Sequence, residues 1–578
     1  MLILSSQQAG ELLRYARKQL LMHFGVIADT TISLSPELEN FPFQKTNITL
    51  RRNSVLRASM SGTGATFLEA IADAIQKCVN DKRFLGGPIV AAELDKIHIE
   101  LWIQVNEDRL NNSNLEEIKK IFNLGIHGID IRRNDHYAYY KPSVAITSRF
   151  NSMERLLERL CRKAKLNSND WKENDAILNR THWLHYAEPL HGSTEAISLI
   201  RLRSRNQISV NTETITQALR LTAKRLCASQ RADGTYNYTY DAYKDIFDNE
   251  GFNMVRMAGC AYAVARTAAC ELTQDIQTLT EASAEKAIRF LLSISTPSPN
   301  SNDHIFIADG MKRRNRGKLG TSALTLLALQ FGNFPTRFAE ERKQISNLIL
   351  SLQRTNGSLQ CFIPDNPDPD KGKNFFPGEA LLALCHELKQ GNTQVQATIE
   401  NAFPYYHNHF QTDPSTAFIL WQMDTWQRFY QIQEANNMPT AQLTPYREFI
   451  FSMADWLLKH QYTEENAPSE DYIGGFQLGK IPGTSSTVHT ESLILACGIA
   501  ERLGLEEKIN RYRQAARRGL EFTLRLQLTE KESFLFPQPA LAIGGITGNI
   551  NSFKIRNDHD QHAMTAFIAA LETPSVID

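Results

Sequence analysis

The stretch ILSLQRTNGSLQCF, residues 349–362, decides the fold of the larger part of this chain. An apolar run of helical spacing ends on Gln353, a polar turn containing Gly357 follows, and an aromatic residue, Phe362, closes the stretch. A glutamine amide can hydrogen-bond the backbone where a helix ends, and glycine readily takes the left-handed conformation that terminates many helices. The stretch therefore predicts a helix end, a tight turn and an aromatic side chain that fills the space beside them.

Three further copies of this phrase occur along the chain. Residues 226–238 read LCASQRADGTYNY, residues 457–461 and 474–477 read LLKHQ and GGFQ, and residues 524–536, LRLQLTEKESFLF, form a fainter copy. Apolar residues around the copies recur at helical spacing, which predicts a series of helices. Their expected ranges are 212–229, 253–271, 280–294, 319–332, 338–353, 377–390, 394–410, 415–433, 445–461, 487–504, 506–527 and 557–572.

These helices fall into six pairs, and each copy of the phrase follows the first helix of a pair. Repeated units of this size bury their apolar faces against one another in a stacked or closed array. We therefore predict that residues 210–578 form an all-α domain, an (α/α)6 toroid whose second helices line the inside of the ring. The Gln–Gly–aromatic phrase resembles the repeat of prenyltransferase and terpene-cyclase toroids. The six pairs are similar to those of six-hairpin glycosidases, polysaccharide lyases and glucuronyl epimerases.

Residues 1–195 mix helical and strand periods. AGELLRYARKQLLMHF (9–24) and ATFLEAIADAIQKCVND (65–81) have helical spacing, whereas apolar residues alternate strictly in KIHIELWIQV (96–105). Strict alternation predicts a strand with one buried face. We therefore predict an α+β domain for residues 1–195.

Several segments of this domain resemble, in order, the AMMECR-type domain: AIADAIQKCVNDKRF, AAELDKIHIELWI, LGIHGIDIRR and LLERLCRKAKLNSNDW. The resemblance implies an α+β fold without a settled biochemical activity. The family's hallmark segment reads Leu-Arg-Gly-Cys-Ile-Gly, and the aligned residues here are LRASMSG, so Arg57 remains and Ser59 stands in place of the Cys. Chemistry that depends on that Cys is therefore excluded, and we expect a changed role or the recruitment of a protein partner. His127 also matches the family, and we interpret it as a turn histidine hydrogen-bonded to the backbone.

Charge and composition exclude several classes of protein. Lys and Arg together number 63, as do Asp and Glu, so the formal net charge is zero, which argues against a general nucleic-acid binder. The 8 cysteines lack C-x-x-C spacing, which is typical of reduced, buried thiols. No window approaches the roughly 18 apolar residues of a membrane span, and the first residues lack the pattern of a signal peptide. We expect a soluble, cytoplasmic protein that binds neither nucleic acid nor membrane.

In the predicted ring, the second helix of each pair begins at one common rim. Helix N-termini present free N–H groups and a positive dipole end, which favour polar and anionic ligands. The candidates at these starts are Asn253, Arg256, Lys318, Glu379, Trp421, His489, Glu491, Arg556, Asp558 and His562. We expect them to share one basin, with Glu379, His489, Glu491, Asp558 and His562 as the catalytic candidates. Each also has a structural interpretation, such as helix initiation at Glu379 or an Asp–His pair on one helix face.

Two loops lead to the same rim. DGTYNYTYDAYKDIFDNEGFN (233–253) combines tyrosines with acidic residues, which suits the binding of a sugar or peptide. ADGMKRRNRGKLG (308–320) is basic and suits an anionic substrate. The predicted substrate-binding residues are Tyr238, Tyr240, Asp241, Asn253, Arg256, Lys318, Trp421 and Arg556.

These residues predict an enzyme that acts on a carbohydrate or another polar, anionic substrate. Two carboxyl groups would serve a hydrolase, whereas a histidine base with an arginine beside it would serve a lyase or an epimerase. The alternative is a non-catalytic binding or scaffold protein, or a peptide-tailoring partner in a biosynthetic pathway. We expect no cofactor and no metal, although His489, Asp558 and His562 are residue types that bind zinc. PDNPDPDKGK (364–373) is acidic, but its prolines indicate a loop rather than the ionising motif of a terpene cyclase.

Overall fold

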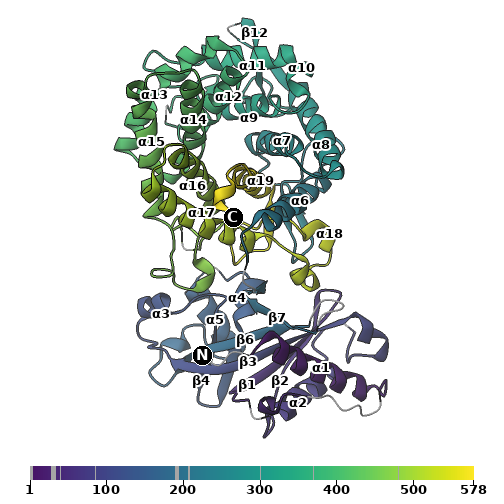
Figure 1. The fold of residues 1–578 in the computed structure, drawn as a ribbon. Coiled ribbons are helices and arrows are strands. Elements are labelled where there is room, and N and C mark those ends of the chain that lie inside the picture. Colours follow the sequence, from purple (N-terminus) through teal and green to yellow (C-terminus); the bar gives the residue numbers. More distant parts are fainter. Residues whose placement is uncertain are drawn as a thin grey trace. The chain divides into compact units, whose positions relative to one another are not determined.

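The chain folds into two compact units. The computed structural model describes residues 4–27, 34–39, 41–84, 86–150, 152–188, 194–205, 208–299, 301–368, 370–479 and 481–577. The N-terminal unit comprises Met1–Gln207 and Thr529–Pro539, and the toroid unit comprises Ile208–Leu528 and Ala540–Asp578. Figure 1 shows the strands and helices of the first unit and the ring of helices of the second.

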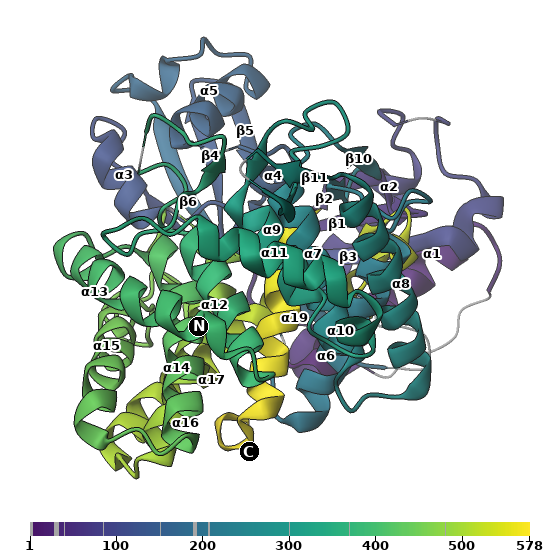
Figure 2. The same cartoon turned by 90° about the horizontal axis from the view of Figure 1, so that it is seen from above.

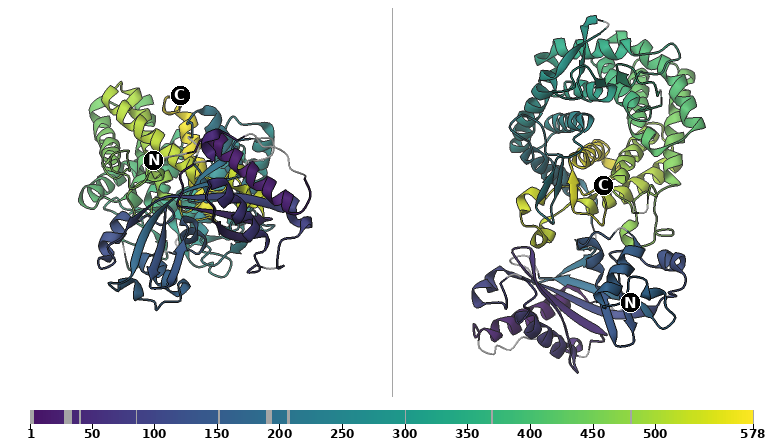
Figure 3. Two further views of the ribbon diagram at one scale, coloured as in Figure 1. Left: turned by 90° about the horizontal axis from the view of Figure 1, so that it is seen from below. Right: turned by 180° about the vertical axis from the view of Figure 1, so that it is seen from behind.

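Six helix pairs build the toroid unit, as the sequence predicts. The outer helices are α6 (Thr212–Ala228), α8 (Gln274–Ser293), α11 (Ala339–Ser351), α13 (Gln396–Thr412), α15 (Thr440–Leu458) and α17 (Glu506–Leu526). The inner helices are α7 (Met254–Ala268), α9 (Leu319–Ala328), α12 (Phe376–Lys389), α14 (Thr416–Ala435), α16 (Ser485–Arg502) and α19 (Asn557–Glu572). Each inner helix contacts the next, and α19 contacts α7, so the ring closes (Figures 1 and 3). The prediction of an (α/α)6 toroid is confirmed.

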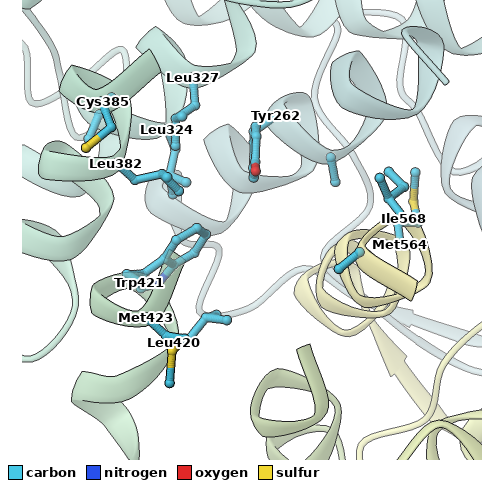
Figure 4. Close-up of a cluster of buried hydrophobic side chains, with 14 of the residues drawn as sticks. Tyr262, Leu324, Leu327, Leu382, Cys385, Leu420, Trp421, Met423, Met564 and Ile568 are labelled. Carbon is cyan, nitrogen blue, oxygen red and sulfur yellow. The ribbon is translucent and has the colours of Figure 1, made fainter. Parts of the chain in front are cut away.

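The amino-acid pattern explains which helices lie inside. Every residue of α9, LGTSALTLLA, is buried, as expected for a helix that is apolar on all sides. In α17, by contrast, Ile509 and Tyr512 are buried while Glu507 and Arg511 are exposed, which is the pattern of an outer helix. Figure 4 shows apolar side chains that α7, α9, α12, α14 and α19 contribute to the interior. Figure 2 shows the helices side-on, with α19 in yellow.

The repeated glutamine joins neighbouring outer helices. Nε2 of Gln230 donates to the Ser283 carbonyl of α8 at 2.8 Å, and Nε2 of Gln353 donates to the Thr398 carbonyl of α13 at 2.8 Å. Gln461 and Gln527 repeat the contact with the carbonyls of Ala515 in α17 and Ala218 in α6, each at 2.9 Å. Because α6 is the first outer helix, the last of these contacts closes the outer ring.

The turn after each glutamine contains a glycine that touches the same neighbouring helix. Gly357 has φ 86°, and a Cβ on it would lie 2.1 Å from the Asn401 carbonyl oxygen of α13. In the fainter last copy the corresponding glycine is Gly544, with φ 88°. It lies outside the segment LRLQLTEKESFLF. The residue two positions after the glycine forms an isolated β-bridge with the glutamine. This residue is aromatic in only two of the four copies. The four residues are Tyr236, Leu359, Phe476 and Ile546.

The N-terminal unit is α+β, as predicted. Its antiparallel strands run in the order β2-β1-β3-β6-β4-β5. Their bounds are β1 (Lys45–Arg52), β2 (Val55–Gly62), β3 (Ile97–Arg109), β4 (His127–Arg133), β5 (His136–Tyr140) and β6 (Ile177–Ala187), and β7 (Ile197–Ile200) and β8 (Arg203–Ser204) extend the sheet from β6. The helices are α1 (Ser6–His23), α2 (Phe67–Val79), α3 (Leu115–Ile121), α4 (Pro142–Thr147) and α5 (Met153–Lys163).

One face of the central strands is apolar. Ile48 of β1 and Leu101 of β3 pack in a cluster with residues of α1 and α2. The sheet curls strongly toward its other face. The Tyr139 hydroxyl on the end strand β5 hydrogen-bonds the Ser61 hydroxyl on the opposite end strand β2 at 2.6 Å. The concave face of the sheet is therefore enclosed and polar.

The short segment Thr529–Pro539 packs with the N-terminal unit although it follows α17 in the chain. The ring of Phe534 stacks on His98 with centroids 4.2 Å apart, and the Ser204 N–H donates to Glu532 Oε1 at 2.7 Å. This excursion explains why the last copy of the repeated phrase is interrupted. Among the described helices of the whole chain, none combines the length and apolar character needed to cross a membrane.

Candidate functional site

The starts of the inner helices surround two adjoining cavities. The larger has a volume of about 480 Å³ and the smaller about 320 Å³. Phe375, Trp421, Asp558 and His562 line both, so the two cavities form one basin. Volumes of this size suit a small polar ligand such as one or two sugar rings.

Glu379 lines the smaller cavity from the first turn of α12, where Pro377 begins the helix. Its side chain is buried, and Oε2 has no hydrogen-bond partner among the described residues. Burial raises the pKa of Glu379 to about 8. The carboxyl group is therefore protonated near neutral pH and can donate a proton into the cavity.

Two histidines face the basin from adjacent inner helices, α16 and α19. His489 lines the larger cavity and His562 lines both. Burial lowers the pKa of His489 to about 3 and that of His562 to about 4, so both imidazoles are neutral. No hydrogen bond joins either ring to the described part of the chain, and the Nδ1 atom of each is buried without a partner. Both rings are free to exchange a proton with a bound ligand.

Asp558 is the ionised carboxylate of the basin, and two arginines hold it. Its Oδ2 lies 2.8 Å from Nε of Arg256 in α7, and Oδ1 lies 2.5 Å from Nε of Arg556. Burial works against the charge, but His559, Arg556 and Arg256 lower the pKa of Asp558 to about 2. Arg256 also donates to the Tyr238 hydroxyl and lies over its ring. The Asp558 carboxylate therefore contacts two guanidinium groups.

Further predicted residues lie on the same walls. Asn253 caps α7 by accepting the Val255 N–H at 2.9 Å and lines the smaller cavity, as does Lys318, which pairs with Asp309 at 2.9 Å. Trp421 of α14 offers an apolar ring to both cavities. The basin therefore combines donors, cations and aromatic rings.

Other predicted residues lie outside the cavities. Glu491 points elsewhere: its Oε2 accepts from the Thr565 hydroxyl at 2.8 Å, and its Oε1 lies 3.7 Å from Arg266. Burial raises the pKa of Glu491 to about 8. Tyr240 and Asp241 belong to strand β9 (Thr239–Asp241), which pairs with β15 (Lys554–Arg556). These residues support the walls and do not line the basin.

Sequence reasoning missed several lining residues. His559 lines the larger cavity, and its Nδ1 accepts the Arg556 N–H at 3.3 Å, which fixes the start of α19. It stands between Asp558 and His562 in the sequence, so its position next to two candidates was the available signal. Phe375 and Leu420 are also on the wall, but nothing distinguishes their sequence context from that of core residues.

No group of three or more His, Cys, Asp or Glu within the described ranges is arranged to hold a metal ion. His489, Asp558 and His562 line one cavity, but two arginines occupy the Asp558 carboxylate.

The N-terminal unit contains the segment that resembles the AMMECR-type domain. Residues 48–182 match the AMMECR1 family model. Within this AMMECR1 region, Arg57 of the altered hallmark segment pairs with Glu93 at 2.7 Å. His127 Nδ1 accepts the Asn123 N–H at 2.9 Å, which confirms that it is a turn histidine bonded to backbone. Burial lowers the pKa of His127 to about 3.

Solved structures give distant similarities to both units. An uncharacterized protein from Pyrococcus horikoshii shares 20% identity over 34% of this chain and 98% of its own, with a TM-score of 0.29. Cellobiose 2-epimerase from Bacillus thermoamylovorans shares 12% over 62% of this chain and 98% of its own, at 0.43. A family 76 glycoside hydrolase from a bovine Bacteroides thetaiotaomicron strain shares 10% over 82% and 96%, at 0.42. These similarities are too distant to assign an activity, and no curated protein matches the chain.

Proposed function

We propose that the toroid unit is an enzyme that transfers protons at a carbon next to a carbonyl or carboxylate group of a small polyhydroxylated substrate, as an epimerase, isomerase or lyase does. The observation that carries the proposal is the pair His489 and His562. Two neutral imidazoles from adjacent helices line one cavity, and the protein leaves both without hydrogen bonds among the described residues. A neutral imidazole is the most common general base in enzymes.

The charges in the basin favour proton transfer over hydrolysis. A glycoside hydrolase needs one ionised carboxylate as base or nucleophile and one protonated carboxyl group as acid. Glu379 would supply the acid, but Asp558, the ionised carboxylate, is held by Arg256 and Arg556. The histidines remain as bases, and the arginines can stabilise the oxyanion that develops when the substrate loses its proton.

Each remaining wall has a role in this proposal. Trp421 would pack against the face of a sugar ring, as aromatic side chains do at sugar sites. Glu379 would return a proton or polarise a carbonyl oxygen from the smaller cavity. Tyr238 and Asp558 would position Arg256, and Lys318 would attract an anionic substituent such as a uronate.

The test is hydrogen exchange in heavy water. The full chain is incubated in D₂O with a panel of free aldoses, N-acetylhexosamines and uronates, and proton NMR follows the hydrogen next to the carbonyl. We expect the wild-type chain to exchange this hydrogen in at least one sugar, and His489→Asn and His562→Asn to lose more than about 100-fold of the rate, the scale of general base catalysis.

The control variant is His136→Asn, which changes an exposed histidine of the N-terminal unit. It should exchange at the wild-type rate. Cleavage of glycosides without exchange would replace the proposal by a hydrolase. Saturable sugar binding with neither exchange nor cleavage would leave a binding protein, which is the non-catalytic alternative.

A further inference from the structure

The concave face of the N-terminal sheet forms a second polar site, in a different unit from the basin and independent of the proposed function. Across neighbouring strands, Thr49 of β1 lies opposite Ser59 of β2, and Asn47 lies opposite Trp102 of β3. Asn47, Thr49 and Trp102 are buried, although they lie on the face away from the apolar cluster of α1 and α2. An enclosed polar face inside a curled sheet is a common place for a ligand.

Lys141, just before α4, reaches onto this face. Its Nζ donates to Asn47 Oδ1 and Thr49 Oγ1, both at 2.6 Å, and to Ser59 Oγ at 3.2 Å. Ser59 is the residue that replaces the Cys of the family's hallmark segment. Nζ also lies 4.9 Å from the centre of the Trp102 ring. The ammonium group is held by neutral oxygens alone.

Two further lysines point to the same place, and Tyr139 connects them. Lys45 Nζ lies 4.3 Å and Lys163 Nζ 5.2 Å from the centre of the Tyr139 ring. The Tyr139 hydroxyl accepts from Asn47 Nδ2 at 3.4 Å, and Asn47 binds Lys141. The three ammonium groups therefore surround one small area of the concave face.

No ion pair balances these charges. In the described part of the chain, no carboxylate lies within 4.0 Å of Lys45, Lys141 or Lys163. Glu100, the buried carboxylate nearest this face, is taken by Arg51 at 2.5 Å and by His185 at 2.8 Å. Buried or clustered charges of one sign are unfavourable unless a counter-charge is present.

Two carboxylates favour the charged form of Lys45 from further away. Asp130 and Glu107 lie beyond ion-pair distance, and burial raises the pKa of Asp130 to about 6. Burial lowers the pKa of Lys141 to about 7, although the Glu100 carboxylate opposes this shift, and burial together with Arg83 and Lys45 lowers the pKa of Lys163 to about 8. A bound anion would place a counter-charge next to all three ammonium groups.

Donors and aromatic surfaces remain available to such an anion. An ammonium group carries three protons. Lys141 uses all three within the cluster, whereas Lys163 uses one on the Tyr139 carbonyl at 2.7 Å and Lys45 uses one on the Tyr137 hydroxyl. The indole N–H of Trp102 is buried without a partner among the described residues. The rings of Tyr139 and Trp183 stack with centroids 6.0 Å apart, and both are partly exposed.

We propose that this concave face binds a small oxyanion, a phosphate or a carboxylate, attached to a planar aromatic ring. Lys45, Lys163 and the Trp102 N–H would donate to the oxyanion, Lys141 would add its positive charge from the polar cluster, and Tyr139 and Trp183 would pack against the ring. The site explains why a polar cluster with an excess of cations is buried in a unit whose other faces are apolar or ion-paired.

The experiment is a calorimetric titration of the full chain near pH 6.5 at low salt. Phenyl phosphate and benzoate probe the two oxyanions with a ring, inorganic phosphate probes the oxyanion alone, and phenol probes the ring alone. We expect saturable binding of one ring-bearing anion with a Kd of about 1 mM or tighter. Inorganic phosphate should bind more weakly, and phenol should not bind.

Two variants locate the binding. Lys141→Met should abolish it, and Lys163→Met should weaken it about tenfold, because one charge-assisted hydrogen bond is lost. Lys163 is exposed as a residue, although its ammonium group lies against Tyr139, so this variant should keep its fold and decides the question if Lys141→Met unfolds. Lys120→Met removes the same charge from an exposed position on α3 and should bind as the wild type does.

Three results with the anions and the variants would overturn the proposal. They are the absence of saturable binding of any of the three anions, an unchanged Kd in both Lys141→Met and Lys163→Met, and an equal loss in Lys120→Met. Tight binding of phenol would also overturn it, because the ring and not the charge would then be recognised. None of these results bears on proton exchange in the toroid unit, so the two proposals fail separately.

Discussion

The carboxyl group of Glu379 occupies the space that a side chain on Gly320 would fill. A Cβ at Gly320 of α9 would lie 2.2 Å from Glu379 Oε2 and 2.6 Å from Phe376 Cδ1. Both residues belong to α12, so the glycine lets two inner helices approach closely exactly where the acid meets the smaller cavity. The unpaired acid is therefore a feature of the way α9 and α12 pack, and not of α12 alone.

The first prediction follows from this contact. Gly320→Ala should push the Glu379 side chain out of its position and lower the exchange rate in D₂O at least as much as Glu379→Gln does. Overpacking should also cost about 1–3 kcal/mol in the free energy of unfolding. Urea unfolding and the exchange assay measure the two effects. The control is Gly498→Ala in helix α16 (Ser485–Arg502), where the nearest atom around an added Cβ, apart from the helix's own backbone, lies 3.9 Å away. It should change neither the exchange rate nor the free energy of unfolding. Gly391→Ala would be unsuitable, because φ of Gly391 is 95°.

The second prediction concerns the pH dependence of stability. The pKa of Glu379 is about 8 in the folded chain and has an ordinary value of 4.5. Between these values the folded state holds a proton that the unfolded state releases, so the free energy of unfolding falls as pH rises from 4.5 to about 8. The loss from this group is on the order of 5 kcal/mol at most.

Glu379→Gln should remove the part of the pH-dependent fall in the free energy of unfolding that Glu379 causes. Urea unfolding at about pH 5 and about pH 8.5 measures it, and the variant should gain relative to the wild type only at the higher pH. Glu491 has a pKa shifted in the same direction, so the double variant with Glu491→Gln should show a flatter profile still. Glu340→Gln, at an exposed position on α11, should leave the profile unchanged. A wild-type chain that is equally stable at both pH values would contradict the assigned pKa.

The third prediction concerns Asp558, whose pKa shift has the opposite sign. Its pKa is about 2 in the folded chain against an ordinary value of 3.8, so its contribution to stability is present above pH 3.8 and is lost as pH falls toward 2. Asp558→Asn should cost about 3–5 kcal/mol near pH 6, because Arg256 and Arg556 lose their common partner. The cost should shrink below pH 3.8.

Urea unfolding of Asp558→Asn and of the wild type across this acid range measures how the cost of the substitution depends on pH. Asp303→Asn, which changes an exposed carboxylate on strand β12 (Ser301–Ile307), should be neutral throughout. A constant cost of Asp558→Asn at every pH would show that the carboxylate is not ionised in the folded chain.

Structural features that repeat along the chain can be predicted from the sequence, whereas features that occur once cannot. The helix pairs and the glutamines at Gln230, Gln353 and Gln461 repeat, so their pattern is visible in the sequence, and the structure confirms the closed ring. The excursion of Thr529–Pro539 occurs once and leaves no periodic signal, so the sequence predicts the glutamine of the last copy, Gln527, but not its glycine, Gly544.

The residues of the basin can also be predicted only in part from the sequence. A charged residue at the start of an apolar helix is visible in the sequence, which is why Glu379, His489 and His562 were selected. Whether such a residue turns toward the cavity depends on its neighbours: Glu491, two residues beyond His489, turns instead to Thr565 and Arg266. The curl that brings Lys45, Lys141 and Lys163 together arises from long-range strand pairing, which no local pattern records.

The last prediction tests how the ring is held closed. Gln527 is buried, and its Nε2 donates to the Ala218 carbonyl at 2.9 Å and to the Thr222 hydroxyl at 2.8 Å, which joins the last outer helix to the first. Gln527→Leu leaves these acceptors unpaired, and we expect a loss of about 1–3 kcal/mol in the free energy of unfolding. Because Gln353 makes the corresponding contact inside the ring, Gln353→Leu should cost a similar amount. Gln442→Leu, at an exposed position of α15, should cost nothing measurable, and full stability of Gln527→Leu would mean that inner-helix packing alone closes the ring.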